Sequence, residues 1–279
     1  METLYGVKMS DSDFSRIKNY IEQEVGIKLP YIKKTMVESR LNKRRKEIGL
    51  HTFKEYFDHV FSPGVGKMEL INMIDAVTTN KTDFFREPEH FHYLTSKVLP
   101  QFAEDDSKRF IKIWSAGCST GEEAYTICMV MNEYLRNNNA FNYNLLATDI
   151  STEVLKKGIN AVYKMDRVAA IPMELKKRYL LKSKDKSRNT VRIIPELRKK
   201  VSFQQLNFMH DSYNVNYEFD IVFCRNVLIY FTKEVQEKVI NKLAIKIKAG
   251  GYLFLGHSET IIDMDLPLRQ LGPTMFQKL

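Results

Sequence analysis

The chain has 279 residues, of which 44% are hydrophobic and 28% are charged, so it can bury one sizeable core and carry an appended smaller unit. Its net charge is +9, and thirteen Lys and Arg residues against four Asp and Glu residues lie between positions 160 and 200. No apolar run is long enough to cross a membrane, the first residues lack the features of a secretory signal, and the three cysteines form no disulfide or metal pattern. We therefore expect a cytoplasmic protein with reduced thiols and no bound metal.

The first part of the chain contains only helical patterns. Apolar residues recur at helical spacing in four segments, which begin near Ser10, in the basic run 32–46, at the capping residue Thr52 and near Leu70. The fourth segment is expected to bury Leu70, Ile71, Ile74 and Val77. Because no strand pattern precedes residue 110, we predict a small all-helical domain over residues 1–86.

From about residue 110, strand and helix patterns alternate. Short apolar runs predict strands at 110–114, 144–148, 201–206, 219–224 and 251–255, with helices between most of them. This alternation predicts an α/β domain over residues 87–279, built on an open, mostly parallel sheet of Rossmann type.

A glycine-bracketed turn follows the first predicted strand. Gly117 and Gly121 allow a sharp turn before a helix, whose free N–H groups can face a ligand. Asp149 ends the second strand, where an acidic residue commonly accepts hydrogen bonds from ribose hydroxyls. The pattern favours a nucleotide-like cofactor, although a structural turn and a helix-capping Asp would look the same.

The same turn also matches the G-x-S-x-G motif of serine hydrolases. Ser119 would be the nucleophile, and Asp220 and His257 follow in the right chain order. However, the turn follows the first strand of the sheet, and no glycine-rich oxyanion segment precedes it. The hydrolase remains an alternative hypothesis.

Four segments in chain order carry a resemblance to a known family. The sequences TNKTDFFRE (79–87), WSAGCSTGEE (114–123), FCRNVLIYF (223–231) and GHSE (256–259) are together similar to the chemoreceptor methyltransferase family, CheR. The resemblance implies a class I methyltransferase sheet with a small all-α N-terminal domain and a small β insertion near 160–200. It also implies S-adenosylmethionine as cofactor, S-adenosylhomocysteine as product, and glutamates of methyl-accepting chemotaxis proteins as substrate.

The resemblance further implies which residues surround the cofactor: Asn80, Thr82, Arg86, Gly117, Glu123, Asp149, Asn207, Phe208, Arg225 and Asn226. Arg225 and Asn226 end a predicted strand, where open α/β sheets bind ligands, and the Asn207 amide could face an adenine edge. Glu123 has an alternative interpretation as a first-turn acid favoured by the helix dipole.

Methyl transfer to a glutamate needs no general base, because a carboxylate with a pKa near ~4.3 is already ionised at neutral pH. The reaction needs a carboxylate oxygen in line with the methyl group, and Arg86 and Tyr230 are the candidates for holding it. Without the resemblance, Tyr230 would be interpreted as a packing aromatic.

Two basic regions suggest docking to an acidic partner. The resemblance implies that Arg40, Lys43, Arg44 and Arg45 contact the acidic helical bundle of a receptor. It places a small β subdomain near 160–200, which some relatives use to bind a receptor tail peptide through a glycine-containing loop. The corresponding loop, 182–189, has no glycine, so we expect the enzyme not to need a tail peptide; the role of the other charges there stays open.

Two other functions fit parts of the pattern. A nucleic-acid methyltransferase would suit the calculated pI of 9.2, but we find no Asn/Asp-Pro-Pro-aromatic or catalytic Cys motif. A non-enzymatic receptor adaptor would not need Arg86, Asp149 and Asn226. We therefore expect an enzyme that binds no nucleic acid and does not insert into a membrane. The resemblance, and not the sequence pattern, favours a monomer.

Overall fold

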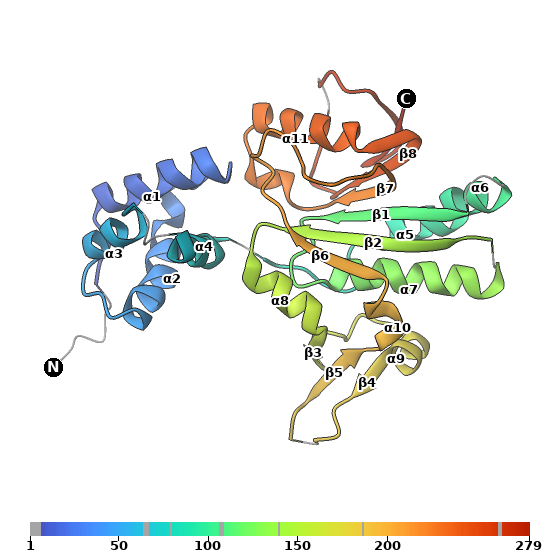
Figure 1. Cartoon of the computed structure of the whole chain (residues 1–279), viewed down its shortest axis with the longest axis horizontal. Coiled ribbons are helices and arrows are strands. Elements are labelled where there is room, and N and C mark those ends of the chain that lie inside the picture. Colours follow the sequence, from blue (N-terminus) through green and yellow to red (C-terminus); the bar gives the residue numbers. More distant parts are fainter. Residues whose placement is uncertain are drawn as a thin grey trace. The chain divides into compact units, whose positions relative to one another are not determined.

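The computed structural model describes residues 7–63, 67–78, 80–105, 109–138, 140–185, 187–261 and 264–279. Of the residues used above, the first six, Thr79 and Lys186 lie outside these ranges. The chain forms two compact units (Figure 1): one comprises residues 1–79, 207–210 and 230–235, and the other comprises the remainder.

The first unit contains the four helices that the sequence predicts. They are α1 (Asp11–Glu24), α2 (Lys34–Glu47, after the 3-10 turn Tyr31–Lys33), α3 (Phe53–Val60) and α4 (Lys67–Val77). Ser10 caps α1 by accepting from the Asp13 amide. Thr52 and Glu55 form a reciprocal capping box on α3, which satisfies amides that have no partner inside the helix.

The packing of these helices differs from the expected pattern at two places. In α4, Glu69, Met73 and Val77 are buried, whereas Leu70 and Ile74 are only half-buried. The reason is that the Glu69 carboxylate joins three helices: it accepts from Arg44 Nη2 of α2 at 2.6 Å and from the Tyr56 hydroxyl of α3 at 3.0 Å. The buried face of α4 therefore includes an ion pair, which the sequence pattern did not predict.

The second unit is built on a seven-stranded sheet in the order β6-β2-β1-β7-β8-β10-β9. The first five of these are parallel, and β10 is antiparallel to both its neighbours. In chain order the strands are β1 (Phe110–Ala116), β2 (Asn142–Asp149), β6 (Val201–Gln205), β7 (Phe219–Cys224), β8 (Ile247–Leu255), β9 (Leu268–Gly272) and β10 (Met275–Lys278). The five parallel strands are those predicted; the last two were not.

The strand order reverses between β1 and β7, and this reversal determines where a ligand can bind. From β1 the chain moves outward through α7 (Glu122–Asn137) to β2, and from β7 it moves the other way through α11 (Lys233–Ile245) to β8. Right-handed crossovers in opposite directions place the two helices on opposite faces of the sheet (Figure 1). The loops that leave β1 and β7 therefore separate at the carboxyl edge, where sheets of this type bind ligands.

Apolar residues fill both faces of the central strands. Every residue of β7 is buried, as expected for a strand covered by helices on both sides. On one face, Phe223 and Phe254 stack at 4.6 Å between ring centroids. On the other, Trp114 packs against Phe219, and its indole N–H donates to Thr148 Oγ1 at 2.9 Å.

Further helices cover the sheet before β1. A continuous helical segment comprises α5 (Glu89–Tyr93), the π-helical turn Leu94–Val98 and α6 (Leu99–Glu104). Its buried side carries Phe91, Leu94, Val98 and Phe102, the face expected from the sequence.

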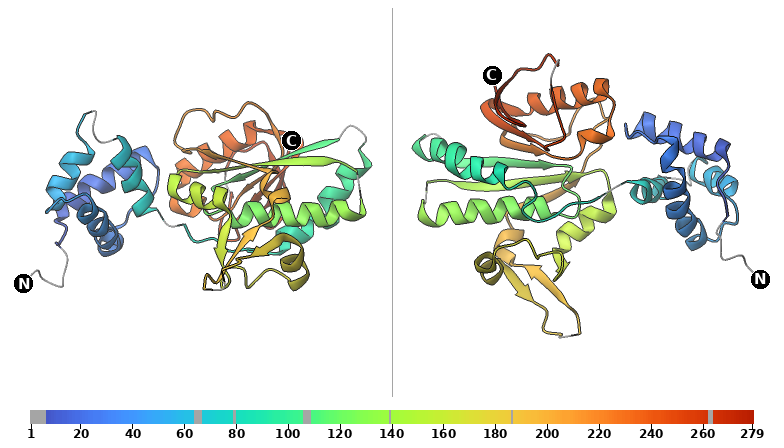
Figure 2. Two further views of the ribbon diagram at one scale, coloured as in Figure 1. Left: turned by 60° about the horizontal axis from the view of Figure 1, so that its bottom comes forward. Right: turned by 180° about the vertical axis from the view of Figure 1, so that it is seen from behind.

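A small second sheet is inserted between β2 and β6. After α8 (Thr152–Asn160), the strands β3 (Val162–Lys164), β4 (Leu180–Lys182) and β5 (Thr190–Ile193) form an antiparallel sheet in the order β3-β5-β4. The helix α9 (Met173–Tyr179) and the short α10 (Pro195–Arg198) complete the insertion. Figure 2 shows the β4–β5 hairpin projecting from this unit.

Among the described residues, no helix combines the length and the apolar composition needed to cross a membrane.

Candidate active site at the carboxyl edge of the sheet

The glycine turn after β1 is tied to the end of β2. The amides of Gly117 and Cys118 donate to the Thr148 carbonyl at 2.7 and 2.8 Å, and the Ser119 amide donates to Asp149 Oδ2 at 2.8 Å. Gly121 has a φ of 92°, a conformation that favours glycine, and it begins α7. The Asp149 carboxylate therefore lies beside the turn.

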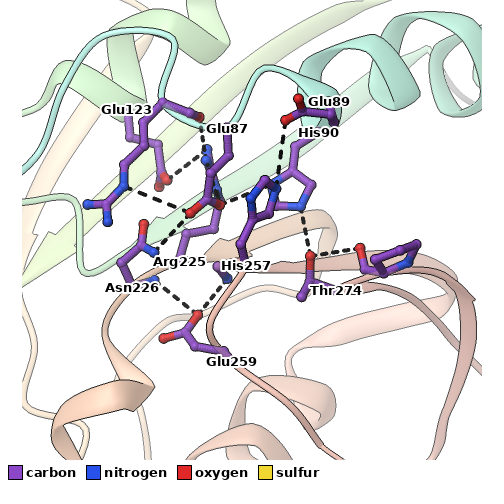
Figure 3. A network of polar contacts seen from close by, with 12 residues as sticks. Glu87, Glu89, His90, Glu123, Arg225, Asn226, His257, Glu259 and Thr274 are labelled. Atoms are coloured by element: carbon purple, nitrogen blue, oxygen red, sulfur yellow. Dashed lines mark hydrogen bonds and ion pairs between the residues drawn. The ribbon is translucent and has the colours of Figure 1, made fainter.

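Arg225 joins two carboxylates where β7 ends (Figure 3). Its Nη2 lies 3.0 Å from Glu87 Oε2, and its Nη1 lies 3.4 Å from Glu123 Oε2. The side chain is only 2% exposed, and its guanidinium also lies over the Phe91 ring. This buried charge is therefore compensated on two sides, as a buried guanidinium requires.

Glu123 is held from the other direction by Ser115, whose hydroxyl donates to Oε1 at 2.6 Å. Burial raises the pKa of the Glu123 carboxyl, and the neighbouring Arg225 opposes that rise. Because its side chain points at Arg225 as well as at Ser115 of β1, Glu123 does more than balance the dipole of α7.

A strained turn presents Arg86. Its two neighbours, Phe85 and Glu87, both have a φ of 54° in the left-handed region. Such conformations cost about 1–2 kcal/mol in residues other than glycine, and they persist at functional sites when the surroundings fix them. The Arg86 side chain is 36% exposed, so unlike that of Arg225 it is accessible to a second molecule.

Arg167 of the insertion supports this turn and was not singled out in the sequence. Its guanidinium donates to Glu122 at 2.9 Å, to Asp83 at 3.2 Å and to the Thr82 carbonyl. Nothing in the local sequence pattern could show this, because Arg167 lies between 45 and 85 residues beyond its partners and in a segment dense with other cations.

One group of described residues could in principle hold a metal ion: Glu87, His90 and His257 offer ligand atoms within 4.8 Å of one another. Burial, assisted by Arg225, lowers the pKa of His90 to about 4, so this histidine is neutral. However, both Glu87 oxygens already accept hydrogen bonds, from Arg225 and from Asn226. A cation at Glu87 would compete with the Arg225 guanidinium. We therefore keep the prediction that the enzyme needs no metal.

The serine hydrolase hypothesis is wrong. Asp220 lies at the beginning of β7 and accepts from the Lys112 amide and the Lys248 ammonium, both at 2.9 Å. Ser119 lies beyond the opposite, carboxyl end of the neighbouring strand β1, and His257 contacts Glu89. The three side chains therefore cannot form a catalytic triad.

The second unit contains most of the predicted site residues: Asn80, Thr82, Arg86, Gly117, Glu123, Asp149, Arg225 and Asn226. Of these, Glu123, Arg225 and Asn226 are connected by hydrogen bonds and ion pairs to Glu87, a residue quoted in the sequence motif but given no role, whereas Asp149 bonds the Ser119 amide. Asn207, Phe208 and Tyr230 belong to the first unit. There the Asn207 amide donates to the Glu24 carbonyl, and Lys33 lies over the Tyr230 ring.

Of the expected receptor-docking residues, the lysine is exposed and the three arginines are bonded within the helical unit. Lys43 is exposed. Arg40 donates to carbonyls at the end of α4, and Arg44 is paired with Glu69. Arg45 is 3% exposed and bonds Leu50 and Asn42, so as a surface docking residue it was predicted wrongly. A buried arginine is rare, and for that reason the basic run was interpreted as wholly exposed.

The groups at this edge suit a cofactor with mixed charges. S-adenosylmethionine has an ammonium, a carboxylate, ribose hydroxyls and a sulfonium, and therefore needs both acidic and basic partners. Asp149 and Glu123 supply carboxylates, and Arg225 supplies a guanidinium, at the point where the strand order reverses. Together the fold and these groups define a class I, S-adenosylmethionine-dependent methyltransferase.

Comparison with known proteins gives the family. Residues 12–78 match the all-alpha domain of the CheR methyltransferase family, and residues 80–276 match its SAM binding domain. Similar proteins include the chemotaxis protein methyltransferases of Borreliella burgdorferi (39% identity, 91% of this chain and 90% of the relative) and Escherichia coli (33%, 96% and 91%). Chemotaxis protein methyltransferase 2 of Pseudomonas aeruginosa is 34% identical over 95% of this chain and 92% of the relative. The chain belongs to the CheR methyltransferase family.

Proposed function

We propose that this enzyme transfers the methyl group of S-adenosylmethionine to glutamate side chains of methyl-accepting chemotaxis proteins. The products are glutamate methyl esters and S-adenosylhomocysteine, and the role is adaptation in chemotaxis, in the cytoplasm. The observation that best supports the cofactor assignment is the tie between Asp149 and the glycine turn, at the carboxyl edge where the strand order reverses. The names of the relatives support the substrate class.

Within this proposal, ten residues surround the cofactor. Asp149 takes the ribose hydroxyls, while Glu123 and Arg225 face the charged amino acid part. The remaining residues of the cofactor set are Asn80, Thr82, Arg86, Gly117, Asn226, Asn207 and Phe208.

The cofactor supplies an electrophilic methyl group, and the chain's own residues position the nucleophile. The substrate carboxylate is already ionised at neutral pH, so no base is required. Arg86 is accessible, and its guanidinium matches a carboxylate in geometry and charge. Together with the Tyr230 hydroxyl it orients one oxygen toward the methyl carbon, and good orientation can supply on the order of 7 kcal/mol.

A titration tests the cofactor assignment. We expect S-adenosylhomocysteine to bind wild type saturably in a calorimeter and to bind Asp149→Ala at least about tenfold more weakly. Asp220→Asn is the control, since Asp220 is likewise a hydrogen-bonded aspartate at a strand end but lies at the other end of the sheet. Absence of binding to wild type would refute the cofactor, and equal binding by Asp149→Ala would refute the ribose contact. Transfer of a labelled methyl group to purified receptor then tests the substrate.

We further propose that the first unit docks on the receptor through exposed basic residues of α2, chiefly Lys43. Arg40 and Arg44 contribute less, because their guanidinium groups already bond to α4. Exposed charges of this kind mainly accelerate association. Lys43→Glu should therefore slow receptor methylation at low salt and leave the affinity for S-adenosylhomocysteine unchanged. An unchanged methylation rate would contradict docking through α2.

The enzyme is also proposed to work without a receptor tail peptide. The β4–β5 connection lacks the glycine that a tail-binding loop would contain, and an Asp185 side chain folds back on Ser187 within it. We expect full-length and tail-truncated receptors to be methylated at equal rates. Strict dependence on the tail would refute this proposal.

A further inference from the structure

A single buried carboxylate holds the loop that leaves β7. Glu259 follows β8, is 5% exposed, and accepts four backbone N–H groups. The Val227 and Leu228 amides donate to Oε1 at 2.8 and 2.6 Å, and the Asn226 and Gly256 amides donate to Oε2 at 3.0 and 2.5 Å. Figure 3 shows Glu259 below Asn226 and joined to it by a dashed line.

The four backbone N–H donors show which protonation state of Glu259 fits this position. An ionised carboxylate offers about four acceptor sites and no donor, so four converging amides use its whole capacity. Burial raises the pKa of the Glu259 carboxyl, and the backbone amides oppose that rise. A protonated or amide side chain would place a donor against these amides, so only the anion satisfies all four.

The segment held in this way has little freedom to adopt another position. Asn226 has a φ of 60°, a strained left-handed conformation. A Cβ atom at Gly256 would lie 2.7 Å from the Asn226 amide nitrogen, and one at Gly117 would lie 2.3 Å from Val227 Cγ2. The two glycines therefore let neighbouring loops close around the segment, and Glu259 fixes its backbone from below.

Asn226 connects the backbone held by Glu259 to the charged side chains of the candidate site. Its side-chain amide donates to Glu87 Oε1 at 3.0 Å, and Glu87 in turn pairs with Arg225. We propose that Glu259 is a positioning residue: it holds Asn226 and Arg225 where they bind the cofactor. This inference rests on the proposed function, since it takes Asn226 and Arg225 as cofactor-binding residues.

Glu259→Gln tests the proposal because the amide has one acceptor oxygen and would leave about two of the four donors unpaired. We expect the KM for S-adenosylmethionine and the Kd for S-adenosylhomocysteine to rise roughly tenfold or more. Glu259→Asp keeps the charge but is one methylene shorter, so it should restore part of the affinity. A purely structural role would instead reduce the amount of active enzyme, and so lower the apparent kcat with KM unchanged.

Asp220→Asn serves as the control for loss of a buried carboxylate, and its KM should equal that of wild type. Unchanged Kd and KM in folded Glu259→Gln would overturn the proposal. If that variant does not fold, hydrogen exchange of the wild type decides: the amides of Asn226, Val227 and Leu228 should exchange far more slowly than those of exposed loops, and loop-like rates would overturn it. Failure of wild type to bind S-adenosylhomocysteine would instead count against the proposed function.

Discussion

At the scale of single residues, the site concentrates strain and buried charge. Four of the described non-glycine residues with positive φ lie in its loops: Phe85, Glu87, Ser119 and Asn226. Each is fixed by a hydrogen bond to a neighbouring segment, such as that from the Phe85 amide to Thr126 Oγ1. The fold thus opposes local relaxation at the places where side chains must be aimed.

Arg225 gives a prediction at this scale. A lysine at 225 has one ammonium in place of a planar fork, so it cannot pair with Glu87 and Glu123 together. We expect Arg225→Lys to bind S-adenosylhomocysteine about tenfold more weakly, a loss of about 1.4 kcal/mol. Calorimetry measures this, with Arg16→Lys as control, since Arg16 forms an exposed pair with Asp58. Equal affinity in both variants would mean that a single charge suffices at position 225.

The sequence predicted these residues unevenly. The positions of Asp149, Arg225 and Asn226 could be predicted, because each lies at the end of a strand with a clear apolar pattern or directly after it; their cofactor-binding roles stay a prediction. Glu87 and Glu259 could not be given roles, because their partners lie 138 or about thirty residues away in the chain. The burial of Arg45 could not be predicted either, since it depends on carbonyl acceptors brought close by the helix end.

At the scale of elements, helix ends and strand patterns decided most of the fold. Thr52 with Glu55 and the glycines after β1 are local signals, and the structure confirms the elements that they begin and end. The antiparallel strands β9 and β10 were missed because they are short and only partly buried, so they lack the continuous apolar pattern of the parallel strands.

The Glu69 cluster gives a prediction for the helical unit. Burial raises the pKa of Glu69, but hydrogen bonds from Arg44, Asn72 and Tyr56 outweigh it, and the pKa is lowered overall. A lowered folded-state pKa means that the pair stabilises the fold above the unfolded value of about 4.5 and that this stabilisation is lost as the pH falls below it. Glu69→Gln should therefore cost about 3 kcal/mol at pH 7, and less under acid conditions.

Urea unfolding followed by circular dichroism measures this cost at neutral and acid pH. Glu47→Gln is the matched control, because Glu47 also pairs with Arg44 but is about half exposed. The control should lose little stability. A pH-independent effect of Glu69→Gln would indicate that packing, and not the charge of Glu69, is what holds α2, α3 and α4 together.

At the scale of the whole molecule, the sequence separates a helical part from an α/β part, and the structure divides into two units. The division is not a simple cut in the chain, because residues 207–210 and 230–235 return to the helical unit. Asn207, Phe208 and Tyr230 lie in these returning segments. A linear sequence pattern shows a change of composition along the chain, but it cannot show which loops pack with which unit.

The single tryptophan of the chain, Trp114, makes this division observable with light. Its indole is buried in β1 between Phe219 and Tyr213, so its emission reports on the α/β unit alone. Circular dichroism records helices of both units. The unfolding midpoint from tryptophan emission can therefore be compared with the midpoint from circular dichroism. A difference between them shows that the two units unfold separately, and the protein needs no added label.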